Sequence, residues 1–169
     1  MIPTSPTPPG TRPGYGVADS RVEMTELVMP PEINPLGSVF GGWVMSLIDR
    51  AAAIAATRHC RGPVATASMD SIDFLAPMKL GHVVRLSAFL TQVFHSSMEV
   101  EVEVQSEDPY TGARNKTCSA FITMVALASD GRPATVPPLE LVTDQERRAA
   151  AEAEERRRQR LARRGRTGA

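Results

Sequence analysis

The stretch Asn34–His59, NPLGSVFGGWVMSLIDRAAAIAATRH, decides the fold of this chain. It opens with a turn-forming loop and then runs from about residue 39 to residue 58 through residues that are mostly apolar. When this run is wound into a helix, apolar side chains fall on nearly every side, which predicts one long, buried helix. Its alanines keep one face thin, so that a sheet can wrap closely around it.

The segments on both sides of this helix have the pattern of β-strands. Residues 98–104 read MEVEVEV, which predicts a strand with its valines in the core and its glutamates in water. Four more strands are predicted at residues 21–29, 64–75, 83–94 and 116–128. The last four strands follow one another through short turns and are therefore expected to be antiparallel. The predicted fold is α+β, a curved antiparallel sheet wrapped around one long central helix.

One helix cannot cover both faces of such a sheet. The outer face needs a second cover, and we expect a second copy of the chain to supply it, so that a dimer is the minimum assembly. The formal net charge of zero gives no global reason to expect nucleic acid or an anionic membrane as a partner.

The 169 residues predict one domain with an arm at each end. Residues 1–19 are rich in proline and glycine and are expected to form a flexible arm, followed by the domain at residues 20–142. Residues 143–169 are rich in arginine and glutamate and predict a helical or disordered tail that starts with TDQE, a capping-box pattern. We interpret this tail as a solvated helix or frayed extension. Binding to nucleic acid is the alternative, but no aromatic residues lie between its arginines.

The cysteines, histidines and remaining acids favour structural roles. Cys60 and Cys118 form no C-x-x-C pair and no metal-type spacing, which predicts a reducing compartment and no metal site. Because the N-terminus lacks the apolar core of a signal peptide, we expect a cytoplasmic protein. Cys118 is interpreted as a core residue. Surface, turn or solvent-facing strand positions are expected for His59, His82, His95, Asp70 and Asp73.

Asp49 is the one acid within the apolar run. A carboxylate on a buried helix is costly unless it is paired, protonated or used chemically. Pairing with Arg50 or Arg58, or a solvated edge of the helix, would be a structural explanation. However, the residues one turn away offer no partner. The sequence therefore favours a general base or a nucleophile at this position.

Two further features stand at the start of the helix. Asn34, before Pro35 and Gly37, is typical of a turn, but its amide can also donate to a carbonyl oxygen. Free N–H groups around Gly42, at the positive end of the helix dipole, favour an oxyanion. An amide donor, a helix N-terminus and a buried acid are the parts needed for transfer of an acyl group to water.

These residues resemble the motif of the hotdog-fold acyl-CoA thioesterases, a family that includes brain-type acyl-CoA hydrolase and small bacterial relatives. The shared pattern is N-x-x-G-x-x-F-G-G-x-x-M followed by an acid on the same helix, here NPLGSVFGGWVMSLID. The similarity extends from about residue 22 to residue 138 and includes FLAPMKLGHVV and ARNK. Pro35, directly after the asparagine, departs from the family pattern and biases Asn34 toward an extended backbone.

The resemblance implies hydrolysis of acyl-CoA to a free acid and coenzyme A, in fatty acid metabolism. No cofactor is implied, because coenzyme A is part of the substrate and product. Asn34 of one protomer and Asp49 of another would face a shared thioester, with the oxyanion near Gly42. The substrate-binding positions it implies are Thr66, Ser96, Ser97, Arg114 and Lys116. Dimers are implied, in many members as trimers of dimers, so that a hexamer is expected.

Two alternatives on the same fold remain open at this point. A non-catalytic acyl-CoA-binding sensor would use the same pocket without a working acid, with the basic tail as its output. A hydratase would pair an acid with a histidine in one motif, and no Asp-x-x-x-x-His lies on the predicted helix.

Overall fold

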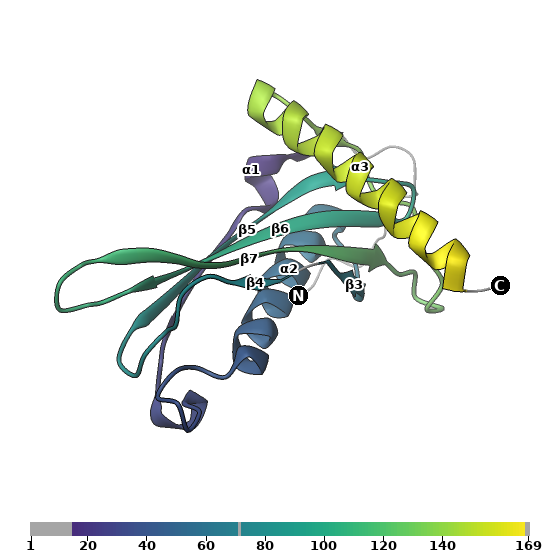
Figure 1. Ribbon diagram of the computed structural model, residues 1–169. Coiled ribbons are helices and arrows are strands. Elements are labelled where there is room, and N and C mark those ends of the chain that lie inside the picture. The colour runs from purple at the N-terminus through teal and green to yellow at the C-terminus, as the bar shows by residue number, and fades with distance from the viewer. Residues whose placement is uncertain (1–14, 71, 168–169) are drawn as a thin grey trace.

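The computed structural model describes residues 15–70 and 72–167. Its elements, in chain order, are β1 (Tyr15–Gly16), α1 (Val17–Ser20), β2 (Val22–Leu27), the 3-10 helix η1 (Pro30–Glu32), α2 (Gly41–Cys60), β3 (Val64–Met69), β4 (Asp73–Phe74), β5 (Val83–Val93), β6 (Ser97–Glu107), β7 (Arg114–Ala126), β8 (Leu139–Glu140) and α3 (Asp144–Thr167). The main sheet has the order β2-β5-β6-β7-β3, with β4 also beside β7. All its pairings are antiparallel, and it curves around α2 (Figure 1). The predicted hotdog fold is confirmed.

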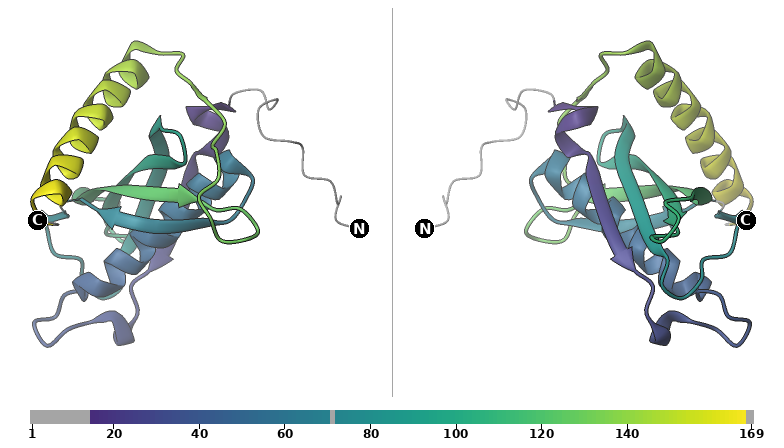
Figure 2. Two further views of the ribbon diagram at one scale, coloured as in Figure 1. Left: turned by 90° about the vertical axis from the view of Figure 1, so that its right-hand side faces the viewer. Right: turned by 90° about the vertical axis from the view of Figure 1, so that its left-hand side faces the viewer.

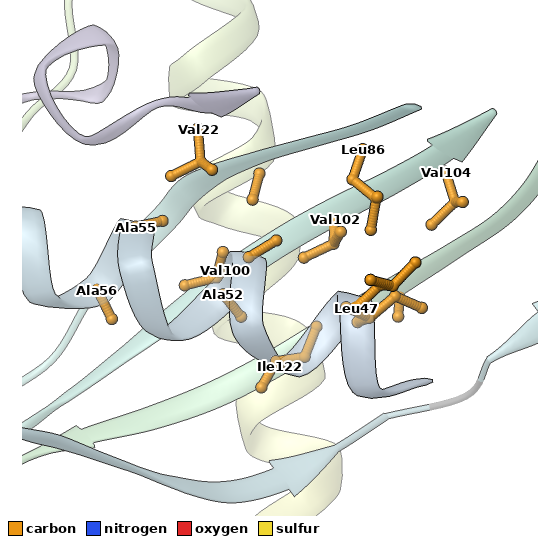
Figure 3. Packing of buried hydrophobic residues seen from close by; sticks show 14 of the residues in the cluster. Val22, Leu47, Ala52, Ala55, Ala56, Leu86, Val100, Val102, Val104 and Ile122 are labelled. Atoms are coloured by element: carbon orange, nitrogen blue, oxygen red, sulfur yellow. The ribbon is translucent and has the colours of Figure 1, made fainter. Parts of the chain in front are cut away.

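The core lies between α2 and the concave face of the sheet. Figure 3 shows Leu47, Ala52 and Ala55 of α2 close to valines of β6. Those valines are fully buried, and so are four alanines of α2, namely Ala51, Ala52, Ala55 and Ala56. Small residues on the helix bring it close to the strands, which is why one helix can fill the concave face. The valines of the MEVEVEV pattern point into the core as predicted.

One side of α2 is not covered within the chain. Met45 and Ile54 are 40% and 41% exposed, and Asp49 between them is only partly buried. The expectation of a helix buried on all sides is therefore wrong for the single chain, because one curved sheet reaches only part of the helix circumference. Met45 lies one turn before Asp49 on this open side, whereas Ile54, nine residues after Met45, lies at its opposite edge.

Three predicted boundaries differ from the structure. The strand predicted at residues 64–75 is two strands, β3 and β4, separated at Asp70. Residues 15–19, assigned by the sequence to the flexible arm, instead form β1 and most of α1, and β1 pairs in parallel with β8. The rest of the predicted arm, at residues 1–14, lies outside the described residues.

The C-terminal tail is a helix that packs on the sheet. Thr143 and Glu146 form the predicted capping box, in which the Glu146 N–H donates to Thr143 Oγ1 at 3.2 Å and the Thr143 N–H donates to Glu146 Oε2 at 2.8 Å. α3 then crosses the outer face of the sheet, on the side opposite α2 (Figure 2). Ala150 and Ala153, on the side of α3 that meets the sheet, are buried. The expected solvated helix is thus a packed one, and it covers part of the face assigned to a second copy.

Glu99 of β6 is also placed differently from the prediction. The alternating pattern put it in water, but its side chain is fully buried under α3. A pattern of period two identifies the two faces of a strand. It does not indicate whether another element covers the second face.

None of the helices within residues 15–70 and 72–167 combines the length and apolarity needed to cross a membrane.

His59, expected at the surface, is buried at the end of α2 and is 1% exposed. Its Nε2 lies 2.9 Å from the Pro137 carbonyl oxygen, and its ring meets Tyr15 edge-on with the ring centroids 5.8 Å apart. Burial lowers the pKa of His59, against the opposing effects of the Pro137 carbonyl and Asp19. The folded protein therefore favours the neutral imidazole.

The free energy of unfolding is expected to fall as the pH drops below about 6.5, the ordinary pKa of histidine. In the window from that value down to the lowered pKa of folded His59, the unfolded chain binds a proton that the folded chain does not. Stability declines there by at most about 1.4 kcal/mol per pH unit, and this group has no effect above the window. Urea unfolding at fixed protein concentration, at about pH 7.5 and about pH 5.5, measures the loss.

His59→Gln should reduce this pH dependence, whereas His95→Gln, at an exposed position, should retain it. An equal loss of stability in wild type and His59→Gln would contradict the assignment.

Candidate active site

Asp49 is held by Thr66 of the neighbouring strand β3. Thr66 Oγ1 donates to Asp49 Oδ1 at 2.6 Å. Neither arginine considered as its partner contacts the carboxylate, because Arg50 Nε donates to the Ser46 carbonyl and Arg58 to the Arg21 carbonyl. No second partner of the carboxylate is found in the described part of the chain. One oxygen is thus fixed by a hydroxyl, and the other is open to a ligand.

A β-bulge gives Thr66 its direction. Thr66 pairs with Met124, but two residues on, Ser68 pairs with Thr123, the residue directly before Met124 on β7. Because neighbouring residues of a strand point to opposite faces, Thr66 and Ser68 lie on opposite faces of the sheet. Ala67 is the extra residue between them. The bulge therefore aims Thr66 at α2 and Ser68 at α3.

Asn34 lies in the loop before α2 and shapes that loop. Its Oδ1 accepts the N–H groups of Leu36, at 2.9 Å, and of Ser38, at 3.3 Å. Its Nδ2 donates to Ser38 Oγ at 3.1 Å and lies 3.5 Å from the Val39 carbonyl oxygen, which is long for a hydrogen bond. The turn role weighed from the sequence is observed, and one amide hydrogen remains weakly engaged.

Two backbone N–H groups are open at the start of α2. Those of Gly41 and Gly42 have no acceptor among the described residues, as expected in the first turn of a helix. A Cβ on Gly41 would lie 3.3 Å from the Phe74 ring, so a side chain there would press on that ring. A Cβ on Gly42 would meet nothing within 4 Å. Gly42 is exposed, and its N–H lies at the positive end of the helix dipole.

The helix separates these donors from Asp49. Gly42 and Asp49 are seven residues apart, which places them about 10 Å apart along the axis at ~1.5 Å per residue. Seven residues are close to two full turns, so both lie on the same side of α2. A reacting carbonyl must touch its base and its oxyanion donors within about 3 Å. One chain cannot supply both groups to the same carbonyl without a large movement.

The predicted substrate-binding residues fall at two ends of the sheet. Ser96 and Ser97 form the β5–β6 turn, where their carbonyl oxygens accept the N–H groups of Ala126 and Phe94. Ser97 pairs with Val125 of β7, and Val125 pairs with Ala65 of β3, the residue directly before Thr66. Ser97 is thus about 10 Å from the Thr66 strand, at ~4.8 Å per strand.

Arg114 and Lys116 lie toward the opposite end of β7. Arg114 Nε is 2.8 Å from Glu107 Oε2, and Lys116 Nζ is 2.8 Å from Glu103 Oε1. Glu107 follows Ser97 by ten residues of β6, so Arg114 is about 30 Å from Ser97 at ~3.3 Å per residue. A single chain does not bring the two serines and the two basic residues into one site.

Other reactive groups are distant from this site or inert. A cleft of about 440 Å³ opens on the outer face of the sheet, between α1, β5, β6 and the start of α3, and none of the predicted site residues is among the described residues that line it. Cys118 is buried in the core as expected, and burial raises the pKa of its thiol. Within residues 15–70 and 72–167, no three metal-ligating side chains cluster.

Sequence reasoning missed three contributors to the site: the hydroxyl of Ser38 beside Asn34, the Phe74 ring behind Gly41, and the bulge at Ala67. Ser38 lies within the NPLGSVFGG motif, and Phe74 begins the FLAPMKLGHVV segment that shares the family resemblance. No pattern in the sequence marks the bulge.

Comparison with known proteins gives one family. The model of the thioesterase superfamily matches residues 36–113. An uncharacterized acyl-CoA thioester hydrolase of Bacillus subtilis is 44% identical over 128 residues, which cover 76% of this chain and 74% of that protein. A hexameric acyl-CoA thioesterase, solved as a crystal structure without ligand, superposes with a TM-score of 0.85 at 41% identity, covering 89% of this chain and 96% of that one.

An acyl-CoA hydrolase from Staphylococcus aureus, solved in complex with butyryl coenzyme A and coenzyme A, has a TM-score of 0.85 at 33% identity and covers 92% of this chain and 95% of that chain. Its structures include variants in which one asparagine, one aspartate or one threonine is replaced by alanine. In that enzyme the asparagine stands 15 positions before the aspartate, and the threonine 17 positions after it. Asn34, Asp49 and Thr66 have the same spacing in this chain.

The identity to the Bacillus protein extends over about three quarters of both chains, and the fold agrees with that of solved acyl-CoA thioesterases. The chain belongs to the thioesterase superfamily, among the hotdog-fold acyl-CoA thioester hydrolases.

Proposed function

We propose that this protein hydrolyses acyl-CoA thioesters to a free carboxylic acid and coenzyme A, with Asp49 as the catalytic carboxylate. The observation that carries the proposal is the 2.6 Å hydrogen bond from Thr66 to Asp49, on the uncovered side of α2. The hydroxyl holds one carboxylate oxygen, and the other oxygen is left to activate water or to attack the thioester carbon. Both roles need an ionised, oriented carboxylate.

Each active site is built from two chains in this proposal. Asn34 and the Gly42 N–H of one chain hold the thioester oxygen, and Asp49 with Thr66 of the other acts on the carbonyl carbon. The separation of about 10 Å along α2 between Gly42 and Asp49 supports this division. The exposed Met45, one turn from Asp49, supports burial of this side of α2 against a second copy. A dimer is therefore the catalytic unit, and we propose three dimers in a hexamer.

Coenzyme A lies between chains in the same way. Ser96 and Ser97 from one end of a sheet, and Arg114 and Lys116 from the far end of another, can meet only in the assembly. Arginine and lysine suit the phosphates of coenzyme A. Each is paired with a glutamate in the single chain, so substrate phosphates would compete with Glu107 and Glu103 for them. No further cofactor is needed, and the free thiol of Cys118 agrees with a cytoplasmic location.

The experiment that tests this function is a panel of acyl-CoA substrates of different chain lengths, with polar and aromatic acyl groups, scored by release of free thiol. Hydrolysis of at least one member is the expected result. Tight binding of an acyl-CoA without thiol release would instead establish the non-catalytic sensor, and the absence of both binding and release would reject the proposed substrate class.

Asn34→Asp is expected to lower kcat on the best substrate by roughly 100-fold, the usual effect of losing one oxyanion donor. Aspartate keeps the acceptor oxygen that the Leu36 and Ser38 N–H groups use, so the loop is preserved while the donor is lost. Leu36→Ala is the matched control, because its side chain is 91% exposed in the same loop. Equal kcat values for Asn34→Asp and wild type would exclude Asn34 from the oxyanion site.

A further inference from the structure

We propose that Arg156 and Arg160 of α3 clamp the bulged strand β3 from the outer face of the sheet and thereby position Thr66 against Asp49. The clamp residues are positioning residues, since they act through Thr66 rather than on the substrate. This inference rests on the proposed function of the Asp49 site.

The first anchor of the clamp is Arg156 on Glu99. Arg156 Nη2 lies 2.7 Å from Glu99 Oε1, and Nε donates to the same carboxylate at 3.2 Å. The guanidinium also lies over the Phe121 ring, 3.7 Å from its centroid. Thr91 Oγ1 donates to Glu99 at 2.8 Å from the other side. A fully buried carboxylate with these partners fixes the rotation of α3 on the sheet.

The second anchor is Arg160, one turn further along the same face of α3. Arg160 Nη1 lies 2.5 Å from Asp70 Oδ2, and both side chains are mostly buried, at 11% and 19% exposed. Asp70 directly follows β3, and its N–H donates to the Phe121 carbonyl at 2.8 Å. The arginine therefore holds the point at which β3 ends, rather than a loop remote from it.

The two anchors lie directly behind the site. The register of the sheet aligns Glu99 of β6 with Thr123 of β7, and Thr123 with Ser68 of β3. On the inner face of the sheet, Met98 of β6 pairs with Met124 of β7, and Met124 pairs with Thr66 of β3. Only the bulge at Ala67 separates Ser68 from Thr66.

A bulge leaves one residue unpaired and weakens the ladder locally. β3 is also the last strand of the sheet within one chain, paired only with β7 among the described residues. The ion pair between Arg160 and Asp70 restrains β3 just beyond the bulge. Without it, β3 gains freedom to shift the bulge or lose it, and either change would turn Thr66 away from Asp49.

The test compares Arg160→Met with wild type in the full-length assembled protein. We expect kcat to fall roughly tenfold with KM changed less than about twofold, because small displacements of catalytic groups reduce the rate more than substrate binding. Asp70→Asn, which removes only the charge of the partner, should give the same fall, and Arg160→Lys should restore part of it. The matched control is Arg158→Met, an exposed arginine on the same helix whose one ion pair among the described residues is with Glu155.

A double-mutant cycle tests whether the effect passes through Thr66. In a Thr66→Ala background, Arg160→Met should change kcat by less than about twofold, because the group it positions is gone. An equal fall in both backgrounds, or an unchanged kcat in Arg160→Met, would overturn the clamp. Amide hydrogen exchange at residues 64–70 gives a readout without catalysis, and there Arg160→Met should lose protection that Arg158→Met keeps; unchanged protection would also overturn it.

These outcomes separate the clamp from the proposed function. If wild type hydrolyses no acyl-CoA, the proposed function fails and hydrogen exchange decides on the clamp as a property of β3. If wild type is active and Asp49→Asn is inactive while Arg160→Met keeps the wild-type kcat, the function stands and the clamp alone is wrong.

Discussion

Asp49→Asn is expected to lower kcat for acyl-CoA hydrolysis by roughly 1,000-fold, within the range for loss of a general base. The amide has nearly the shape of the carboxylate, and its oxygen can still accept the Thr66 hydroxyl, so the local structure is preserved. It carries no negative charge and can neither take a proton from water nor attack a thioester. Thiol release measures the effect, with KM unchanged within about threefold if binding and chemistry are separate.

The matched control for this change is Arg50→Gln at the adjacent position of α2. Arg50 is exposed, and its Nε donates only to the Ser46 carbonyl, so its replacement should leave kcat unchanged. Size-exclusion chromatography and thermal unfolding should give the wild-type result for both variants. Near-wild-type turnover by Asp49→Asn on every substrate of the panel would remove Asp49 from the mechanism and return the site to the sensor hypothesis.

The sequence was sufficient for the elements that local patterns determine. The apolar run placed α2 within two residues at each end, and the MEVEVEV alternation identified the core face of β6. The same patterns identified Asp49, because a charged residue stands out in an apolar run. These are statements about one helix or one strand, and hydrophobic periodicity contains the information for them.

What the sequence could not supply depends on contacts between distant segments. The partner of Asp49 is on a strand 17 residues away, and its direction follows from a bulge that no turn residue marks. Glu99 was assigned to water because the residue that neutralises it, Arg156, is 57 positions away in a segment with the composition of a solvated tail. His59 was misplaced for the same reason, since Pro137 and Tyr15 cover it from both ends of the chain.

The position of the cleft on the outer face agrees with the proposal that two chains build the active site. The described residues of a single chain enclose space between α1 and α3, away from Asp49. At Asp49 the described residues instead leave α2 uncovered, with Met45 exposed one turn away. An acyl chain needs an enclosed apolar pocket. In the proposed dimer, the walls of that pocket would come from the surface that closes over α2.

Arg156→Met is expected to lower the free energy of unfolding by about 3–5 kcal/mol, the usual result of removing one partner of a buried ion pair. Glu99 would remain fully buried with only the Thr91 hydroxyl as a partner. The double variant Arg156→Met/Glu99→Met should be more stable than the single variant, because no unpaired charge is then left buried. Urea unfolding at fixed protein concentration measures all three proteins.

The control for this experiment is Arg158→Met, whose exposed ion pair with Glu155 contributes no more than about 1 kcal/mol. The order of stabilities distinguishes an anchored helix from a helix that merely lies on the sheet. In the second case, replacing either arginine would lower the free energy of unfolding by a similar, small amount. If Arg156→Met were as stable as Arg158→Met, then α3 would not be anchored through Glu99. If the double variant were no more stable than Arg156→Met alone, the loss would come from the packing of the arginine on Phe121 and not from an unpaired carboxylate.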